Sequence, residues 1–262
     1  MKRPWLLCLF LLCVVVAPVL AVQYGGRDEG EHPYVGMLLF YDADGNPMWR
    51  CSGTLLSPTI VLTAAHCTTG TASAQVWFDE LEEDIWDSGF PWSGGTTGTP
   101  YTHPKWDDFA SFPATYDVGV VELDTGVTMS TYGVLCDLGE LNSLNKQKGQ
   151  QNTIFDVTGY GLQSVKPKVS AELSRFKGSV KITNLKSALT DGWNIQATES
   201  PGKGNGQGGT CFGDSGGPML VEDSNVVVGI TSFGKNYNCK GVGYYFRADI
   251  KATQDFVKSF LD

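Results

Sequence analysis

The feature that most constrains the fold of this chain is a series of short apolar segments rich in β-branched and aromatic residues. They lie at residues 34–40, 73–78, 118–123, 155–158, 179–183, 219–222 and 226–231. Turn-forming residues separate them, as at 44–47 (DGNP), and this pattern is typical of β-strands joined by tight connections. The chain is therefore predicted to be an all-β protein.

One helix is expected at the C-terminal end, over residues 248–262. Asp249 can cap its first turn. The residues after it that fall at helical spacing are Ile250, Thr253, Phe256, Val257, Phe260 and Leu261.

The first 21 residues have the composition of a secretory signal peptide. Lys2 and Arg3 form a basic start, residues 5–20 are apolar apart from Pro18, and residues 19–21 (VLA) suit signal peptidase. A membrane anchor is the alternative, but this run is short against the roughly 20 residues that a spanning helix needs. No later stretch is long enough, so we expect a secreted, extracellular protein without a stable membrane anchor.

Removal of this segment makes an acidic chain more acidic. The formal charge changes from −9 to −11, because Lys2 and Arg3 are lost and no acidic residue is. Such a charge argues against nucleic acid or an anionic membrane as a partner. The remaining residues, 22–262, are enough for one or two domains, and all-β barrels often have this length.

A candidate nucleophile lies in residues 213–218 (GDSGGP). Ser215 stands between glycines, where backbone amides can turn toward one point without side chains in the way. The N–H groups of Gly213 and Ser215 could then stabilise an oxyanion while the serine hydroxyl attacks a carbonyl. A plain glycine-rich turn is the alternative, so a base and an acid must be found as well.

The base and the acid have few candidates. Among the three histidines, His66 follows a short β-branched run and two alanines, which leave space beside its ring. His32 and His103 each precede a proline, which favours extended or turn geometry, and we interpret them as structural. Asp117 stands before an apolar strand and is the candidate acid.

The order His66, Asp117, Ser215 resembles that of the trypsin/chymotrypsin-like serine proteases. The local sequences at 63–67 (TAAHC), 117–121 (DVGVV) and 213–218 are similar to the three motifs of that family, and 158–161 (TGYG) and 230–234 (ITSFG) are smaller matches. The resemblance implies a serine endopeptidase with these three catalytic residues, an oxyanion hole at Gly213 and Ser215, and Ser232 bracing the aspartate. No cofactor and no metal are expected. A protein or peptide substrate and a monomeric state are expected.

The same resemblance implies the architecture. Residues 22–262 would form two six-stranded antiparallel β-barrels with a C-terminal α-helix. The N-terminal barrel would cover about 22–137 and the C-terminal barrel about 138–247.

Five cysteines remain after the signal peptide, and a secreted chain is expected to pair them. The resemblance implies that Cys51 pairs with Cys67 and Cys211 with Cys239. Cys136 is then left over. We expect it to be a free, partly buried thiol, with an intermolecular disulfide as the alternative.

The specificity pocket is also predicted from the resemblance. Its floor would be Gly209, six residues before the nucleophile, and its walls Gly234 and Gly243, with Ser232 nearby. An open, uncharged pocket predicts a large apolar side chain at P1, the residue before the cleaved bond. Alternatively, the glycine-rich stretch at 202–209 shifts the alignment and another side chain fills the floor.

The N-terminus departs from the family pattern. Most members are cut after a basic residue, and the new amine pairs with the aspartate before the nucleophile, here Asp214. No basic residue lies between Arg3 and Arg27. Either signal peptidase exposes a working amine at or near Val22, or another donor holds Asp214.

Two rival functions come from other classes. A catalytically inactive homologue acting as a binding module is the first, and an intact His66, Asp117 and Ser215 argue against it. The second is a serine esterase on another scaffold, in which the nucleophile comes first in the chain.

The acidic stretch at 79–84 is interpreted as a solvated loop rather than a calcium site.

Overall fold

The computed structural model describes residues 22, 25–79, 89–146, 153–199 and 208–261. The predicted signal peptide at 1–21, most of the acidic stretch at 79–84 and most of the stretch at 202–209 lie outside these residues. No helix in the described part of the chain is long and apolar enough to cross a membrane.

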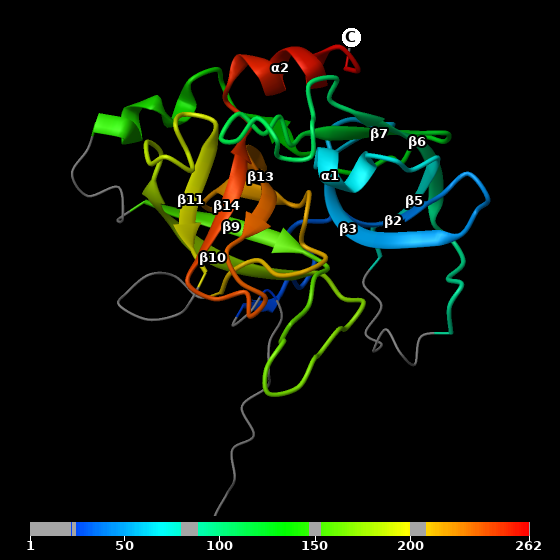
Figure 1. Ribbon diagram of the computed structural model, residues 1–262. Coiled ribbons are helices and arrows are strands. Elements are labelled where there is room, and N and C mark those ends of the chain that lie inside the picture. Colours follow the sequence, from blue (N-terminus) through cyan, green and yellow to red (C-terminus); the bar gives the residue numbers. More distant parts are fainter. Residues whose placement is uncertain (1–21, 23–24, 80–88, 147–152, 200–207, 262) are drawn as a thin grey trace, which may run out of the picture.

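The first half of the chain forms a closed barrel of six strands in the order β2-β3-β4-β7-β6-β5 (Figure 1). The strands are β2 (Val35–Tyr41), β3 (Pro47–Leu55), β4 (Ile60–Thr63), β5 (Ser73–Trp77), β6 (Thr96–Thr102) and β7 (Gly119–Leu123). Every pairing in it is antiparallel.

The second half forms another antiparallel barrel, in the order β10-β11-β14-β13-β12-β9, closed because β9 also pairs with β10. Its strands are β9 (Ile154–Gly159), β10 (Phe176–Asn184), β11 (Asn194–Thr198), β12 (Pro218–Val221), β13 (Val226–Gly234) and β14 (Val242–Arg247). Two short strands add to it: β1 (Gly26–Arg27) pairs with β10, and β8 (Val134–Leu135) runs parallel to β13. The predicted all-β fold with two six-stranded barrels is confirmed. The predicted boundary at 137/138 falls between β8 and β9 and stays a prediction.

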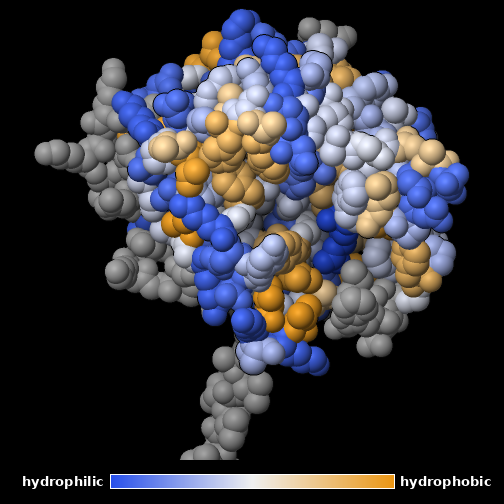
Figure 2. All heavy atoms as spheres, in the orientation of Figure 1, coloured by the Kyte–Doolittle hydropathy of each residue, from blue (hydrophilic) through white to orange (hydrophobic). Residues whose placement is uncertain are grey.

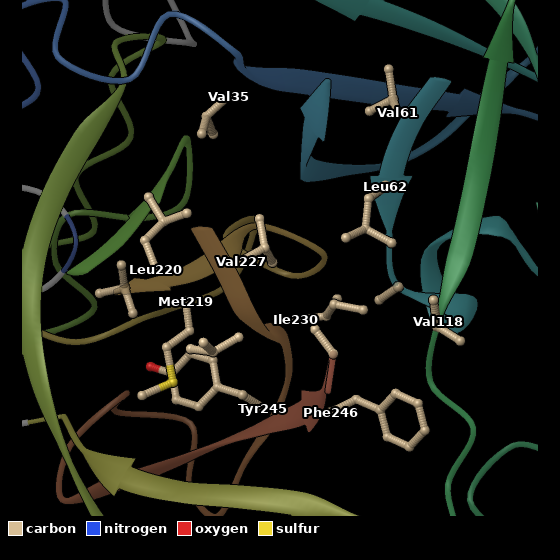
Figure 3. Packing of buried hydrophobic residues seen from close by; sticks show 14 of the residues in the cluster. Val35, Val61, Leu62, Val118, Met219, Leu220, Val227, Ile230, Tyr245 and Phe246 are labelled. Atoms are coloured by element: carbon tan, nitrogen blue, oxygen red, sulfur yellow. The ribbon is translucent and has the colours of Figure 1, made fainter. Parts of the chain in front are cut away.

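One apolar core cluster extends through both barrels. Figure 3 shows Leu62 and Val118 of the first barrel near Ile230 and Phe246 of the second, across the junction. All four side chains are at most 1% exposed. Since burial of each such side chain contributes roughly 1.5–3 kcal/mol, this junction holds the two barrels against each other.

Among the described residues the helices are few and short: α1 (Ala65–Thr68), the 3₁₀ helix η1 (Glu140–Lys146) and α2 (Lys251–Lys258). The predicted C-terminal helix is present but shorter than 248–262. The predicted cap at Asp249 is wrong, because Ile250 is the residue that precedes the first turn and no side chain caps it. The Asp249 carboxylate instead accepts hydrogen bonds from Arg247 and from the Leu141 amide.

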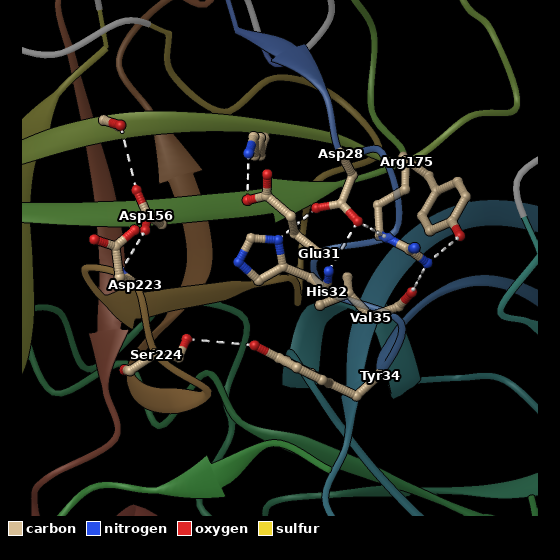
Figure 4. A network of polar contacts seen from close by, with 12 residues as sticks. Asp28, Glu31, His32, Tyr34, Val35, Asp156, Arg175, Asp223 and Ser224 are labelled. Atoms are coloured by element: carbon tan, nitrogen blue, oxygen red, sulfur yellow. Dashed lines mark hydrogen bonds and ion pairs between the residues drawn. The ribbon is translucent and has the colours of Figure 1, made fainter. Parts of the chain in front are cut away.

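A buried polar network ties the start of the chain to both barrels (Figure 4). Asp28 accepts hydrogen bonds from the ring and the backbone amide of His32 and, at 2.7 Å, from Nε of Arg175. Arg175 lies just before β10 and donates to the backbone oxygens of Val35 and Phe78 in or beside the first barrel. Because Asp28 is fully buried, each of its charge-assisted bonds is protected from solvent.

Candidate active site

His66 and Asp117 meet because the strands that lead to them are paired. β4 runs antiparallel to β7 with Thr63 opposite Gly119, so the residues just after one strand and just before the other share one end of the barrel. The His66 amide donates to Oδ1 of Asp117 at 2.9 Å. Its ring Nδ1 lies 2.8 Å from Oδ2, and since an ionised carboxylate only accepts, Nδ1 carries the proton.

The surroundings of this pair keep the carboxylate charged. Asp117 is fully buried, and the Ser232 hydroxyl donates to its Oδ2 at 2.5 Å. Burial alone would raise the pKa of Asp117, but the charge and hydrogen bonds of His66 and the bond from Ser232 lower it overall. Burial would likewise lower the pKa of His66, but attraction to Asp117 and their hydrogen bond raise it overall. The free ring nitrogen, Nε2, is therefore a stronger base than in an ordinary histidine.

The loop around Ser215 needs its glycines. Gly213 has φ +97° and Gly216 φ +80°, conformations that side chains rarely adopt. A Cβ at Gly216 would lie 2.0 Å from Oγ1 of Thr63, so no larger residue fits there. Ser52 of β3 anchors this loop to the first barrel, because its hydroxyl donates to Gly213 O and its amide to Ser215 O, both at 2.8 Å.

Two backbone donors beside Ser215 are unused. Within the described residues, the N–H groups of Gly213 and Ser215 donate to no acceptor, whereas those of Asp214, Gly216 and Gly217 all do. Unused donors next to a hydroxyl are what the stabilisation of an oxyanion requires.

His66, which belongs to α1, and Ser215 line one cavity of 490 Å³. Ser232, Phe233, Gly234 and Glu199 also contribute to its wall. No hydrogen bond joins the Ser215 hydroxyl to the His66 ring in the part of the chain that the structure describes. Such contacts are often long before substrate binds.

The face of the molecule seen in Figure 2 is mostly hydrophilic, with hydrophobic side chains in several separate groups.

Of the residues predicted to bind substrate, Ser232 and Gly234 line this cavity and Gly209 and Gly243 lie behind Glu199. A Cβ at Gly243 would lie 1.8 Å from Oε1 of Glu199, and a Cβ at Gly209 would lie 2.4 Å from its Cα. Glu199 is thus the side chain that lies against both glycines, and which residue forms the floor of a specificity pocket stays a prediction.

Sequence reasoning missed Glu199. It follows β11 directly, and its amide donates to Gly241 O at 2.9 Å, which holds it beside the segment leading into β14. Burial is the largest cause that raises the pKa of Glu199 to about 7, and the nearby charge of Asp214 adds to it. The signal in the sequence was an acidic residue at the end of a strand, ten residues before the predicted floor at Gly209.

Comparison with known proteins decides the family. The chain matches the Trypsin family model over residues 24–257. It belongs to the trypsin family. Chymotrypsin-C of Bos taurus is 32% identical over 222 residues, which are 82% of this chain and 79% of that protein. Chymotrypsin-like elastase family member 1 of Felis catus is 26% identical over 219 residues, covering 82% and 80% of the two chains. An HL collagenase structure has the same fold, with a TM-score of 0.66 at 20% identity over 91% of this chain and 97% of its own.

In this trypsin-family chain, Asp214 is fully buried, and no Lys or Arg among the described residues forms an ion pair with it. Its oxygens accept hydrogen bonds from the amides of Gly161 at 2.7 Å and Cys211 at 2.9 Å. Burial is the main cause that raises its pKa to about 6, while these amides and the positive charge of Arg50 act in the opposite direction. The amides of Gly161 and Cys211 and the charge of Arg50 are therefore partners that could hold the Asp214 carboxyl group without an N-terminal amine. The working N-terminus stays a prediction.

The cysteines of this trypsin-family chain pair as expected. Disulfides join Cys51 to Cys67 and Cys211 to Cys239. Cys136 is the free cysteine among the described residues, and it is buried. Burial and the charges of Asp249 and Glu140 raise the pKa of its thiol to about 12, so it is a poor nucleophile.

The residues described offer one group of three possible metal ligands, Cys51, His66 and Cys67. Two of its members share a disulfide and provide no thiolate, so this group does not fit a metal ion. The other histidines lie elsewhere: His32 binds Asp28, and His103 stacks on Tyr116 with ring centroids 5.0 Å apart.

Proposed function

We propose that this protein is a secreted serine endopeptidase that cleaves proteins or peptides through Ser215, His66 and Asp117. The observation that carries the proposal is that His66, held by the buried carboxylate of Asp117, lines the same cavity as Ser215, beside two unused backbone donors. Membership of the trypsin family supports it, as do relatives named chymotrypsin and elastase.

The proposed reaction has two halves. Ser215 Oγ attacks the peptide carbonyl while Nε2 of His66 takes its proton, and the N–H groups of Gly213 and Ser215 stabilise the negative oxygen that forms. His66 then gives the proton to the leaving amine, the carbon–nitrogen bond breaks, and an acyl group remains on Ser215. Water, deprotonated by His66, attacks this ester and releases the acid and the serine. Asp117 keeps the imidazole in one tautomer and stabilises its positive charge.

The cavity beside Ser215 would receive the P1 side chain. Phe233 and Gly234 line its wall, and while Glu199 is neutral the cavity carries no negative charge from it. For that state we propose a preference for a large apolar P1 residue. Substrate-binding residues would be Ser232 and Gly234, with Gly209 and Gly243 shaping the cavity through their contacts with Glu199.

The two disulfides support export to an oxidising compartment. The protein is further proposed to be a monomer, with no membrane anchor and no nucleic-acid partner.

The inactive homologue is not favoured. A protein that only binds has no need for a buried carboxylate that holds His66 by both its amide and its ring.

The test is turnover by the processed protein. A fluorophosphonate should label wild-type protein at one site, and Ser215→Ala should lose labelling and several orders of magnitude of peptidase activity. Ser143→Ala, at an exposed serine of η1, is the matched control and should keep both. Near-normal peptidase activity in Ser215→Ala would contradict the proposal.

A further inference from the structure

Glu199 brings a carboxyl group into the cavity beside Ser215. The residue is only 3% exposed, yet it contributes to the cavity wall together with Thr210. The Thr210 hydroxyl donates to Glu199 Oε1 at 2.5 Å and also lies 3.3 Å from the hydroxyl of Tyr245. The carboxyl therefore has a fixed position set by two hydroxyl groups.

No cation accompanies this carboxyl group within the residues that the structure describes. Lys235 lines the same cavity, but its ammonium lies over the ring of Tyr244, 5.5 Å from the centroid. The charged group that does act on Glu199 is Asp214, which is itself an acid. Burial raises the pKa of Tyr245 well above its usual value, so it stays a neutral hydroxyl. An ionised Glu199 thus lacks the positive partner that a buried charge needs.

We propose that Glu199 is the specificity-determining residue of the P1 pocket, binding Lys or Arg at P1 when ionised and admitting an apolar P1 side chain when protonated. This rests on the proposed peptidase function. A P1 ammonium or guanidinium would supply the missing positive charge, and charge-assisted hydrogen bonds to carboxylate are about twice as strong as neutral ones. The acid reaches the pocket from the end of β11 instead of from the floor position, which is Gly209.

The pH at which the preference changes follows from the same surroundings. Burial and Asp214 bring the pKa of Glu199 to about 7, so below this pH the acid is mostly neutral and above it mostly charged. The preference for a basic over an apolar P1 residue should therefore rise with pH across the neutral range.

The experiment compares two peptides that differ only in having Arg or Phe at P1, between about pH 5.5 and 8.5. The ratio of their kcat/KM values cancels the titration of His66, which affects both substrates equally. For wild type the ratio should rise at least about 30-fold, because the ionised fraction of a group with a pKa near 7 changes by that factor over the interval. Glu199→Gln should give a ratio that does not change with pH. Glu222→Gln, at an exposed position outside the cavity, should retain the rise.

Thr210→Val provides a second variant in case Glu199→Gln does not fold. Its hydroxyl favours the ionised carboxylate, so its loss should move the midpoint of the ratio to higher pH. A wild-type ratio that does not change with pH, or an undiminished rise in Glu199→Gln, would overturn the inference.

Binding of benzamidine to Ser215→Ala, followed by calorimetry, tests the pocket without turnover. Affinity should increase with pH through about 7 and lose this dependence when Glu199→Gln is added. If wild type cleaves neither peptide and takes no fluorophosphonate, the proposed function fails, while benzamidine still reports on Glu199. If wild type cleaves both peptides at a constant ratio, the function stands and the role of Glu199 fails.

Discussion

Single residues in this chain take their chemistry from one or two neighbours. Asp117 accepts from the amide and the ring of His66 and from the hydroxyl of Ser232, and its charge raises the pKa of the imidazole. Catalysis needs the neutral imidazole, so activity should be lost as the pH falls through a value above the ordinary 6.5 of histidine.

Replacement of the charge alone tests this link. Asp117→Asn should reduce kcat by about 10⁴-fold, because an amide favours the wrong tautomer of His66. The acid side of the kcat/KM profile of the residual activity should also move to lower pH, since the attraction that raises the pKa of His66 is gone. Both are read from steady-state kinetics between about pH 5 and 9, with Asp124→Asn, at an exposed position after β7, as control. An unmoved acid limb would show that Asp117 does not control the pKa of His66.

Helix α2 begins next to a buried ion pair instead of at a capping side chain. It lacks a side-chain cap, and the buried Asp249 before it binds Arg247 at the end of β14 through two hydrogen bonds of 2.7 and 2.6 Å. The same carboxylate accepts the Leu141 amide of η1 at 2.9 Å. One carboxylate therefore joins β14 to η1 directly before the start of α2.

Asp249→Ala should lower the free energy of unfolding by about 3–5 kcal/mol, because it leaves the Arg247 guanidinium buried without its partner. Urea unfolding followed by tryptophan fluorescence gives this value. Asp255→Ala, which breaks an exposed pair with Lys251 on α2, should change it by under about 1 kcal/mol. Equal effects of the two substitutions would contradict the role given to Asp249.

At the scale of the whole molecule, the site exists only where the barrels meet. His66 and Asp117 belong to the first barrel, Ser215 and Ser232 to the second, and Ser52 links the two through Gly213 and Ser215. Asp214 is buried beside Arg50 of the first barrel, and Glu199 is buried within the second; their pKa values are raised to about 6 and about 7. Such groups hold their protons longer in the folded than in the unfolded chain, so their effect is to lower stability as the pH rises.

The pH dependence of unfolding tests this. The pKa of an ordinary glutamate is 4.5, and that of Glu199 is raised to about 7. Ionisation of Glu199 should therefore lower the free energy of unfolding by about 3 kcal/mol as the pH rises from below 4.5 to above 7. Glu199→Gln should lack that part of the loss. Urea unfolding of the two proteins at about pH 4 and pH 8 measures it, with Glu222→Gln expected to follow wild type. The same loss in wild type and Glu199→Gln would mean that Glu199 ionises as freely in the folded as in the unfolded chain.

What the sequence determined by itself was carried by short local patterns. The β-branched runs form the strands, because alternation and turn residues act over a few positions, and the motifs around His66, Asp117 and Ser215 predicted a cluster that the structure shows as one bonded pair and a serine on the same cavity. Only the tertiary structure decided the wall of the pocket. Antiparallel pairing of β11 with β14 sets Glu199 against Gly243, and no pattern of neighbouring residues records that distant contact. The tertiary structure also decided the role of Asp249. Its carboxylate accepts hydrogen bonds from Arg247 and Leu141 instead of capping the helix that follows it, because a buried charge needs partners and these are the ones that lie beside it in the fold.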